Sequence, residues 1–167
     1  MTACDIFKSI SPELGSEILG FIQKNHKDVF RATVTTLAPQ RKLRPVFVER
    51  KPPAEQLRWV LDTLRFRTSE AVGEQILQVW LMKSESAMLV DFMDALGLDH
   101  DGNGAVEDLP LELDAGKTKT AVAGLLEKYD AAKVAIYLHV FQLQQSGGWP
   151  PLTEVLASEP KLKLGNS

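Results

Sequence analysis

The stretch AAKVAIYLHVFQLQQ, residues 131–145, is apolar on almost every side when it is wound into a helix. A helix on a protein surface carries one apolar stripe, whereas a helix that is apolar nearly all round is buried. The sequence therefore predicts that 131–145 is the central helix of the fold and that Ile136, Val140 and Leu143 are almost fully buried. Two glycines at 147–148 follow at once and are expected to end it.

Outward from this segment, apolar residues recur at intervals of three and four along most of the chain, which is the spacing of a helix face. Further helices are predicted over residues 12–22, 27–37, 54–66, 69–83, 86–97, 117–129 and 149–157. The sequence contains no convincing strand. We therefore expect an all-α fold, an irregular bundle of seven to eight helices, in a single domain covering residues 1–167.

Three segments lack a helical pattern. Residues 38–53 contain four prolines, of which Pro39 is expected to end the preceding helix, so the segment is predicted to be a packed connector. Its centre, PVFVER, fits either a short extended piece or a single turn. Residues 98–116 are predicted to be an acidic loop, and residues 158–167 a frayed tail.

The composition excludes several classes of protein. With 44% hydrophobic and 25% charged residues, the chain has the balance of a globular protein. No apolar run approaches the roughly 18–20 residues that span a bilayer, and the N-terminus lacks the pattern of a secretory leader. One cysteine, Cys4, excludes an internal disulfide and a multi-cysteine zinc site. We expect a cytoplasmic protein without a membrane partner.

The charges are distributed unevenly. Residues 41–67 contain eight basic and three acidic residues, whereas residues 84–130 contain three lysines and eleven acids. Either the two segments face each other and neutralise on folding, or they form surfaces of opposite sign for separate partners. The sequence leaves both alternatives open.

The stretch DHDGNGAVEDLP, residues 99–110, carries oxygen-bearing side chains at alternate positions, followed by a glycine. It resembles the calcium loop of the EF-hand family, in which the first, third and fifth residues supply oxygen ligands and the sixth is glycine. The resemblance implies a calcium site whose ligands are Asp99, Asp101, Asn103, the carbonyl of Ala105 and, through a water, Glu107.

The twelfth position departs from the family pattern, because Pro110 replaces the glutamate that supplies two oxygens. Glu112 follows closely enough to be considered as a substitute ligand. Without the bidentate glutamate, the resemblance implies only weak calcium binding, and no other cofactor is expected. The alternative is a polar loop built from Asp-Gly and Asn-Gly turns, in which Asp99 and Asn103 bond nearby backbone amides.

The segment RKLRPVFVERK, residues 41–51, combines basic residues with an aromatic ring. Such a segment can bind nucleic acid, but the sequence pI of about 5.6 and the acidic second half disfavour a polyanion. A protein partner of unknown identity is favoured instead, and Trp149 is expected to be partly exposed at the start of the last helix. The candidate interaction residues are Arg41, Lys42, Arg44, Phe47, Arg50, Lys51 and Trp149.

No complete catalytic set is recognisable, so an enzyme is the less favoured class. The sequence favours a non-catalytic protein-interaction or scaffold module. The alternatives are a weak calcium-binding helical protein acting through 99–110 and a nucleic-acid-associated protein acting through 41–67. Stretches such as LRPVFVERKP (43–52) and VAIYLHVFQLQQSGGW (134–149) resemble small uncharacterised bacterial helical proteins. That resemblance implies a helical domain and no particular function.

Overall fold

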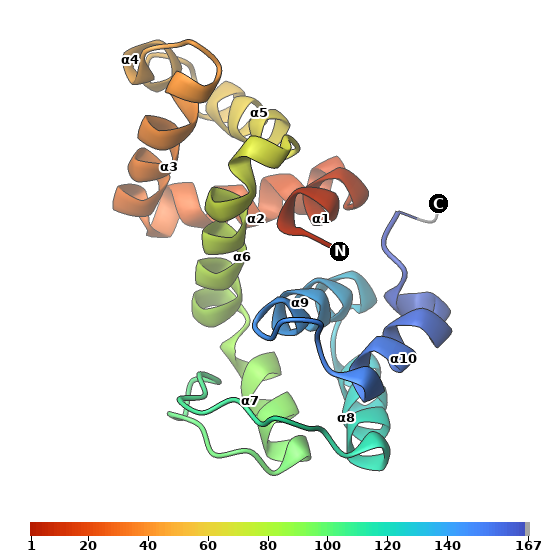
Figure 1. Ribbon diagram of the computed structural model, residues 1–167. Helices are drawn as coiled ribbons and strands as arrows, with labels where there is room; N and C mark the ends of the chain where they lie inside the picture. Colours follow the sequence, from red (N-terminus) through yellow and green to blue (C-terminus); the bar gives the residue numbers. More distant parts are fainter. Residues whose placement is uncertain (166–167) are drawn as a thin grey trace. The chain divides into compact units, whose positions relative to one another are not determined.

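The computed structural model describes residues 1–165 and shows an all-α protein (Figure 1). The chain is 73% helical, and no strand occurs within residues 1–165. The predicted fold class is therefore confirmed. The same residues form ten α-helices, because two short helices that the apolar spacing did not predict are present in addition to the expected ones. None of the described helices combines the length and apolar character that a membrane crossing requires.

The chain divides into two compact units, Met1–Trp80 and Leu81–Ser167. The boundary falls inside one helix, α6 (Glu70–Ser84). Each unit has its own set of buried apolar residues. The single domain over 1–167 stays a prediction.

Unit 1 contains five helices before α6: α1 (Ala3–Ser9), α2 (Pro12–Asn25), α3 (Lys27–Gln40), α4 (Pro45–Glu49) and α5 (Pro53–Leu64). A short 3-10 helix, Arg67–Ser69, leads into α6. Three of these helices begin at a proline, which is suited to the first helical position because no amide hydrogen is needed there. Their inward faces supply the core, which includes Phe7, Ile18, Leu19, Ile22, Leu37, Val60 and Leu64.

Helix α1 was not predicted, and it fixes the N-terminal segment. The Thr2 side chain accepts a hydrogen bond from the amide of Asp5, whose carboxylate accepts one from the Thr2 amide. The Glu70 carboxylate accepts two more amide hydrogens, those of Ala3 and Cys4, at 2.6 and 3.0 Å. Because these bonds satisfy the first amides of the helix, a segment of only seven residues is stable in this position.

The predicted end of α3 at Pro39 is wrong, because the helix continues to Gln40. It ends where Lys42 adopts a left-handed conformation with φ of 58°. The amide of Leu43 then donates to the carbonyl of Ala38, and the amide of Lys42 donates to that of Pro39, which closes the helix in a Schellman motif. The segment 38–53 is thus a helix end, a short link and the single helical turn α4, whose one buried residue is Val48.

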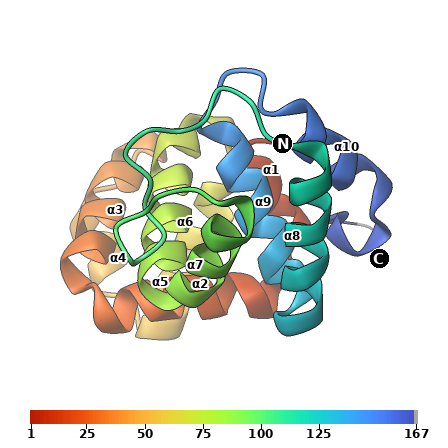
Figure 2. The same ribbon diagram turned by 90° about the horizontal axis from the view of Figure 1, so that it is seen from below.

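Unit 2 contains the end of α6 and then α7 (Ser86–Leu96), α8 (Ala115–Lys128), α9 (Ala131–Leu143) and α10 (Pro150–Ser158). Gly97 ends α7 with φ of 71°, as expected. The stretch between α7 and α8 is the longest non-helical part of residues 1–165, and its course is clear in Figure 2. It is shorter than predicted, since the Asp114 carboxylate caps α8 by accepting the amide of Lys117 at 2.8 Å.

Helix α9 is buried along most of its length, as its composition predicted. Ile136 and Val140 are buried, but the prediction for Leu143 is wrong, since this side chain is 37% exposed. Leu143 is the last residue of α9, which ends two residues earlier than expected, so no further turn covers it. The predicted frayed tail is also wrong over 158–165, because Pro160–Leu162 form a 3-10 helix that packs on α9 and buries Leu162. Residues 166–167 lie outside the described residues.

Candidate functional site

Arginine is confined to one part of the chain. All seven arginines lie between residues 31 and 67, within unit 1. Unit 1 has twelve basic and nine acidic residues, whereas unit 2 has seven lysines and thirteen acids. The planar guanidinium group binds carboxylates and phosphates through paired hydrogen bonds, which lysine cannot do. Recognition of an anionic partner is therefore best sought on unit 1.

The link and the helical turn at residues 42–51, which we call the α4 tip, expose an unusual number of apolar side chains. Leu43, Val46 and Phe47 are 37%, 38% and 55% exposed, and they are three of the eight exposed large hydrophobic residues among those described. Val48 alone turns inward from α4. Because a single helical turn has one inward face, the other apolar side chains remain in solvent. Such a local concentration is more typical of a binding surface than of scattered exposure.

The four cations of the α4 tip are neighbours of these apolar residues in sequence and have no ion-pair partner among the described residues. Lys42, Arg44 and Arg50 are exposed, Lys51 is half-buried, and none of the four makes an ion pair with any described residue. Their charges are therefore not neutralised within the part of the chain that the structure describes. The α4 tip is consequently a surface on which an apolar anchor is bordered by available positive charge.

The polar side chains beneath the α4 tip hold its backbone in place. The Gln56 side-chain amide donates to the carbonyls of Glu49 and Lys51, both at 2.9 Å. Gln23 in turn donates to the Gln56 side-chain oxygen at 3.1 Å and to the carbonyl of Pro53 at 3.3 Å. Because these bonds join the end of the tip to α2 and α5, a partner would meet a surface that is already ordered.

A groove of about 620 Å³ lies next to the end of the α4 tip, and Glu49, Gln56 and Gln23 are among its lining residues. Its floor includes Phe30 and Val34, which are buried, and its rim carries Lys24, Lys27 and Arg31, which are exposed. None of these three cations makes an ion pair among the described residues. The groove extends the same combination of apolar contact and unpaired positive charge beyond the α4 tip.

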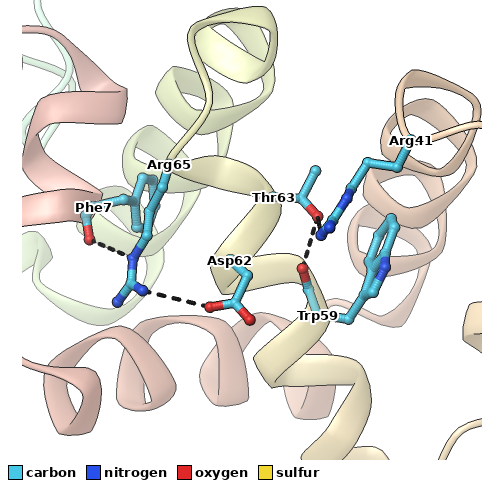
Figure 3. Close-up of polar contacts among 6 residues, drawn as sticks. All are labelled: Phe7, Arg41, Trp59, Asp62, Thr63 and Arg65. Carbon is cyan, nitrogen blue, oxygen red and sulfur yellow. Dashed lines mark hydrogen bonds and ion pairs between the residues drawn. The ribbon is translucent and has the colours of Figure 1, made fainter.

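Arg41 does not belong to the α4 tip, although the sequence grouped it there. Its guanidinium lies over the ring of Trp59, with 5.9 Å to the ring centroid, and over that of Phe66, with 5.6 Å. Nη1 of Arg41 donates to Oγ1 of Thr63 at 3.2 Å, and the Thr63 hydroxyl donates to the carbonyl of Trp59 at 2.8 Å (Figure 3). Arg41 is thus oriented by α5.

Arg65 has a structural role instead. Its Nε donates to the carbonyl of Phe7 at 3.4 Å, and its Nη1 lies 3.4 Å from the Asp62 carboxylate (Figure 3). These contacts join α1 to α5 and use the donors that a ligand would need. Sequence reasoning could not separate Arg65 from the other arginines, because the distinction depends on which helix packs nearby.

The acidic loop is ordered by a different residue from those expected. Oδ1 of Asp101 accepts the amides of Asn103 and Ala105 at 2.8 and 3.1 Å, whereas Asp99 and Asn103 were predicted to bond backbone amides. The two amide hydrogen bonds hold the pKa of Asp101 below its usual value. Nδ1 of His100 accepts the amide of Gly102, and Nε2 therefore donates to the Asp94 carboxylate at 2.7 Å.

Four of the proposed calcium ligands, Asp99, Asp101, Ala105 and Glu107, line one open hollow of about 510 Å³ in the acidic loop. Asp99, Glu107 and Glu112 are exposed and make no side-chain hydrogen bond with any described residue. No group of three or more His, Cys, Asp or Glu side chains within residues 1–165 is arranged to hold a metal ion. Calcium binding stays a prediction that only titration tests. The sixth-position glycine, Gly104, packs closely against Leu89 of α7.

Trp149 was expected to be exposed, and this prediction is wrong. Its exposed fraction is 0%, its ring stacks on Phe141 with centroids 4.7 Å apart, and Nε1 donates to the carbonyl of Pro110 at 2.9 Å. Gly147 and Gly148 both have positive φ and turn the chain so that the ring enters unit 2. Trp149 therefore anchors the end of the acidic loop and is not a partner-binding residue.

A polar cluster that the sequence did not indicate joins α7 to α8. The Asp91 carboxylate accepts hydrogen bonds from Nζ of Lys128 and from the hydroxyl of Tyr129. These two bonds, of which the one from Lys128 has the larger effect, hold the pKa of Asp91 below its usual range. Burial and the bond to Asp91 raise the pKa of Tyr129. The cluster fastens α7 to α8.

Comparison with protein-family models, with curated proteins and with solved structures found no match to this chain. The candidate site is therefore defined by geometry alone: the α4 tip and the adjoining groove on unit 1. Sequence reasoning identified the right segment, since five of the seven candidate interaction residues lie on the tip. It missed the groove, because Lys24, Lys27 and Arg31 converge on Glu49 and Pro53 only after folding.

Proposed function

We propose that this protein is a non-catalytic interaction module whose α4 tip binds an acidic, partly apolar surface of a protein partner. The observation that carries the proposal is the patch of Leu43, Val46 and Phe47 bordered by cations without ion pairs. Aromatic and arginine side chains dominate the binding energy of many protein interfaces. Phe47 is accordingly the expected anchor, and Arg44 and Arg50 are expected to accelerate association with an acidic partner.

The shape of the surface supports a protein partner. The tip exposes apolar side chains beside cations, and the groove, which it meets at Glu49, is likewise lined by apolar and charged residues. This combination is found in interfaces with a buried centre and a polar rim. The backbone of the tip is already fixed by Gln56 and Gln23, so little ordering cost opposes association.

The test is site-specific photocrosslinking in the native cell, with a benzophenone amino acid in place of Phe47. Met82 on α6 is the control, because it is an exposed large hydrophobic residue, 41% against 55% for Phe47, that lies in neither the α4 tip nor the groove. We expect one defined protein to crosslink at position 47 and not at position 82. The captured protein, once purified, should bind the wild type at least about tenfold more tightly than Phe47→Asp, a loss of about 1.4 kcal/mol. Equal capture at both positions, or no capture, would contradict the proposal.

Nucleic acid is a second candidate partner, favoured by Arg44 and Arg50, which lie at the two ends of α4, the helical turn that exposes Phe47. The ring could stack on a base while the arginines bind phosphates. Fluorescence anisotropy with a single-stranded oligonucleotide at several salt concentrations tests this candidate. Binding that weakens with salt and is lost in Arg44→Glu/Arg50→Glu would replace the protein partner with a nucleic acid.

A further inference from the structure

A small notch on unit 1 lies outside the α4 tip and has a different character. It has a volume of about 270 Å³ and is lined by Gln40, Arg41, Thr63, Phe66 and Thr68. Figure 3 shows the Arg41 guanidinium beside Thr63 and the Trp59 ring. We refer to these five lining residues as the Arg41 notch.

The guanidinium in the Arg41 notch is fixed before any ligand arrives. Trp59 and Phe66 contact it through their rings, and the buried hydroxyl of Thr63 accepts one of its hydrogens. Thr63 is itself fixed by its bond to the carbonyl of Trp59. An arginine that is oriented in this way loses less conformational entropy on binding than a free surface arginine does.

The donors that remain in the notch have no acceptor among the described residues. Arginine carries five N–H groups, and the bond to Thr63 uses one of them. No carboxylate of the described residues forms an ion pair with Arg41. The Gln40 side-chain oxygen shares the single Ser69 hydroxyl proton with the carbonyl of Thr63, at 3.2 and 2.9 Å. The Gln40 amide nitrogen and the Thr68 hydroxyl make no hydrogen bond with any of the described residues.

The available donors suit a tetrahedral anion better than a planar one. A carboxylate presents two oxygens in one plane, and the edge of a single guanidinium can satisfy both. Gln40 and Thr68 add neutral donors from two further parts of the chain, the end of α3 and the 3-10 helix. A phosphate group has additional oxygens for such donors, and the exposed Arg67, next to Thr68 in sequence, supplies a second positive charge nearby.

We propose that the Arg41 notch binds a phosphate monoester group, with Arg41 as the principal ligand and Gln40 and Thr68 as supporting donors. The proposal does not depend on the protein partner of the α4 tip, since it involves different side chains. The same chemistry could reach the notch as free phosphate, as a phosphorylated side chain or as a nucleotide, and the test separates these sources.

The test is an NMR titration of the full chain that follows the Arg41 side-chain Nε–H signal. Inorganic phosphate, O-phosphoserine and adenosine monophosphate are the phosphate probes, and acetate is the carboxylate probe. We expect saturable shifts of Arg41 with phosphate and none of comparable size with acetate. The phosphate source that binds more tightly than inorganic phosphate identifies the form that the notch accepts.

Three variants complete the test. Arg41→Lys keeps the charge and loses the planar group, and it should weaken phosphate binding about tenfold, which corresponds to 1.4 kcal/mol. Thr68→Val alters an exposed side chain without disturbing the core and should weaken binding to a smaller extent. Arg58→Gln, an exposed arginine on the same α5, is the matched control and should change nothing. Equal responses to acetate and phosphate, shifts spread evenly over all arginines, or full binding by Arg41→Lys would overturn the proposal.

Discussion

Gly104 in the acidic loop should tolerate no side chain, whereas Gly102, two residues earlier, should tolerate one at moderate cost. Both glycines have φ of 89°, a conformation that is unfavourable for any residue with a Cβ atom. They differ in their surroundings. A Cβ atom added to Gly104 would lie 2.3 Å from Cβ of Leu89 on α7, whereas nothing lies within 4 Å of a Cβ added to Gly102.

The expected losses of unfolding free energy follow from two costs, that of the backbone conformation and that of the steric overlap. The left-handed conformation costs alanine about 1–2 kcal/mol, and this term applies to both positions. Gly104→Ala adds an overpacking cost of about 1–3 kcal/mol, because the opposing atom is a Cβ close to the backbone and not the end of a flexible side chain. Replacing glycine by alanine lowers the conformational entropy of the unfolded chain equally in both variants, so this contribution cancels in the comparison. Gly104→Ala should therefore lose about 1–3 kcal/mol more than Gly102→Ala.

Native-state hydrogen exchange of the α9 amides is a suitable assay, since these buried amides lie in the same unit as the acidic loop and exchange only when that part of the chain opens. The two variants are compared at the same pH and temperature. If they lose the same free energy within about 0.5 kcal/mol, the loop does not pack on α7 as described. Gly104 would then be required only for the backbone conformation of its turn.

Four further outcomes are expected. Asp91→Asn should reduce the fall in thermal midpoint at acid pH. The Asp91 carboxylate has a lowered pKa in the folded state, so it stabilises the fold above about pH 3.9 and loses this effect as the pH falls through its folded pKa. An unchanged dependence of the thermal midpoint on pH would contradict this. Gly124→Ala should raise the unfolding free energy by about 0.5–1 kcal/mol in denaturant titration, since this helical glycine has open space around it, and a loss would count against the helix register. Excess calcium over chelator should leave the thermal midpoint unchanged, because Asp101 already uses Oδ1 for amides, and a rise of several degrees would show a bound ion. Ile136→Ala should cost about 2–5 kcal/mol by denaturant titration, and a loss below about 1 kcal/mol would mean that α9 is not central.

The helices were predictable because apolar spacing and capping are local signals. The segments around Ile18, Val60 and Ile136 each have a continuous apolar face, and each is helical and buried. The end of α7 was predictable for the same reason, since Gly97 has the conformation that terminates a helix.

Two of the errors occurred where a residue far along the chain decides the outcome. Helix α1 depends on Glu70, whose carboxylate accepts a hydrogen bond from the amide of Ala3, 67 residues away in the sequence. Trp149 is buried because the carbonyl of Pro110 and the ring of Phe141 receive it, and neither contact is visible in the apolar pattern. Local signals cannot report such partners.

The candidate site was predictable in part. Basic residues beside Phe47 identified the segment 41–51, and the exposed patch lies there. The different role of Arg41 was not predictable, because Trp59 and Phe66 approach it only when α3 and α5 pack together. Charge in a sequence indicates where an anion can bind, but the packing of neighbouring rings decides which arginines are oriented for it.

The most direct test of the central claim is the affinity of the protein captured at position 47 for the wild type, Phe47→Ala and Arg44→Ala/Arg50→Ala, measured by calorimetry at low and high salt. The claim is that the α4 tip is a binding surface and contributes little to folding. Phe47→Ala should therefore weaken binding about tenfold or more at either salt concentration while the thermal midpoint stays unchanged. The arginine variant should lose affinity mainly at low salt, where exposed charges are screened least. Unchanged affinity in both variants, or a fall in thermal stability that accounts for the loss of binding, would contradict the assignment of the tip as the functional surface.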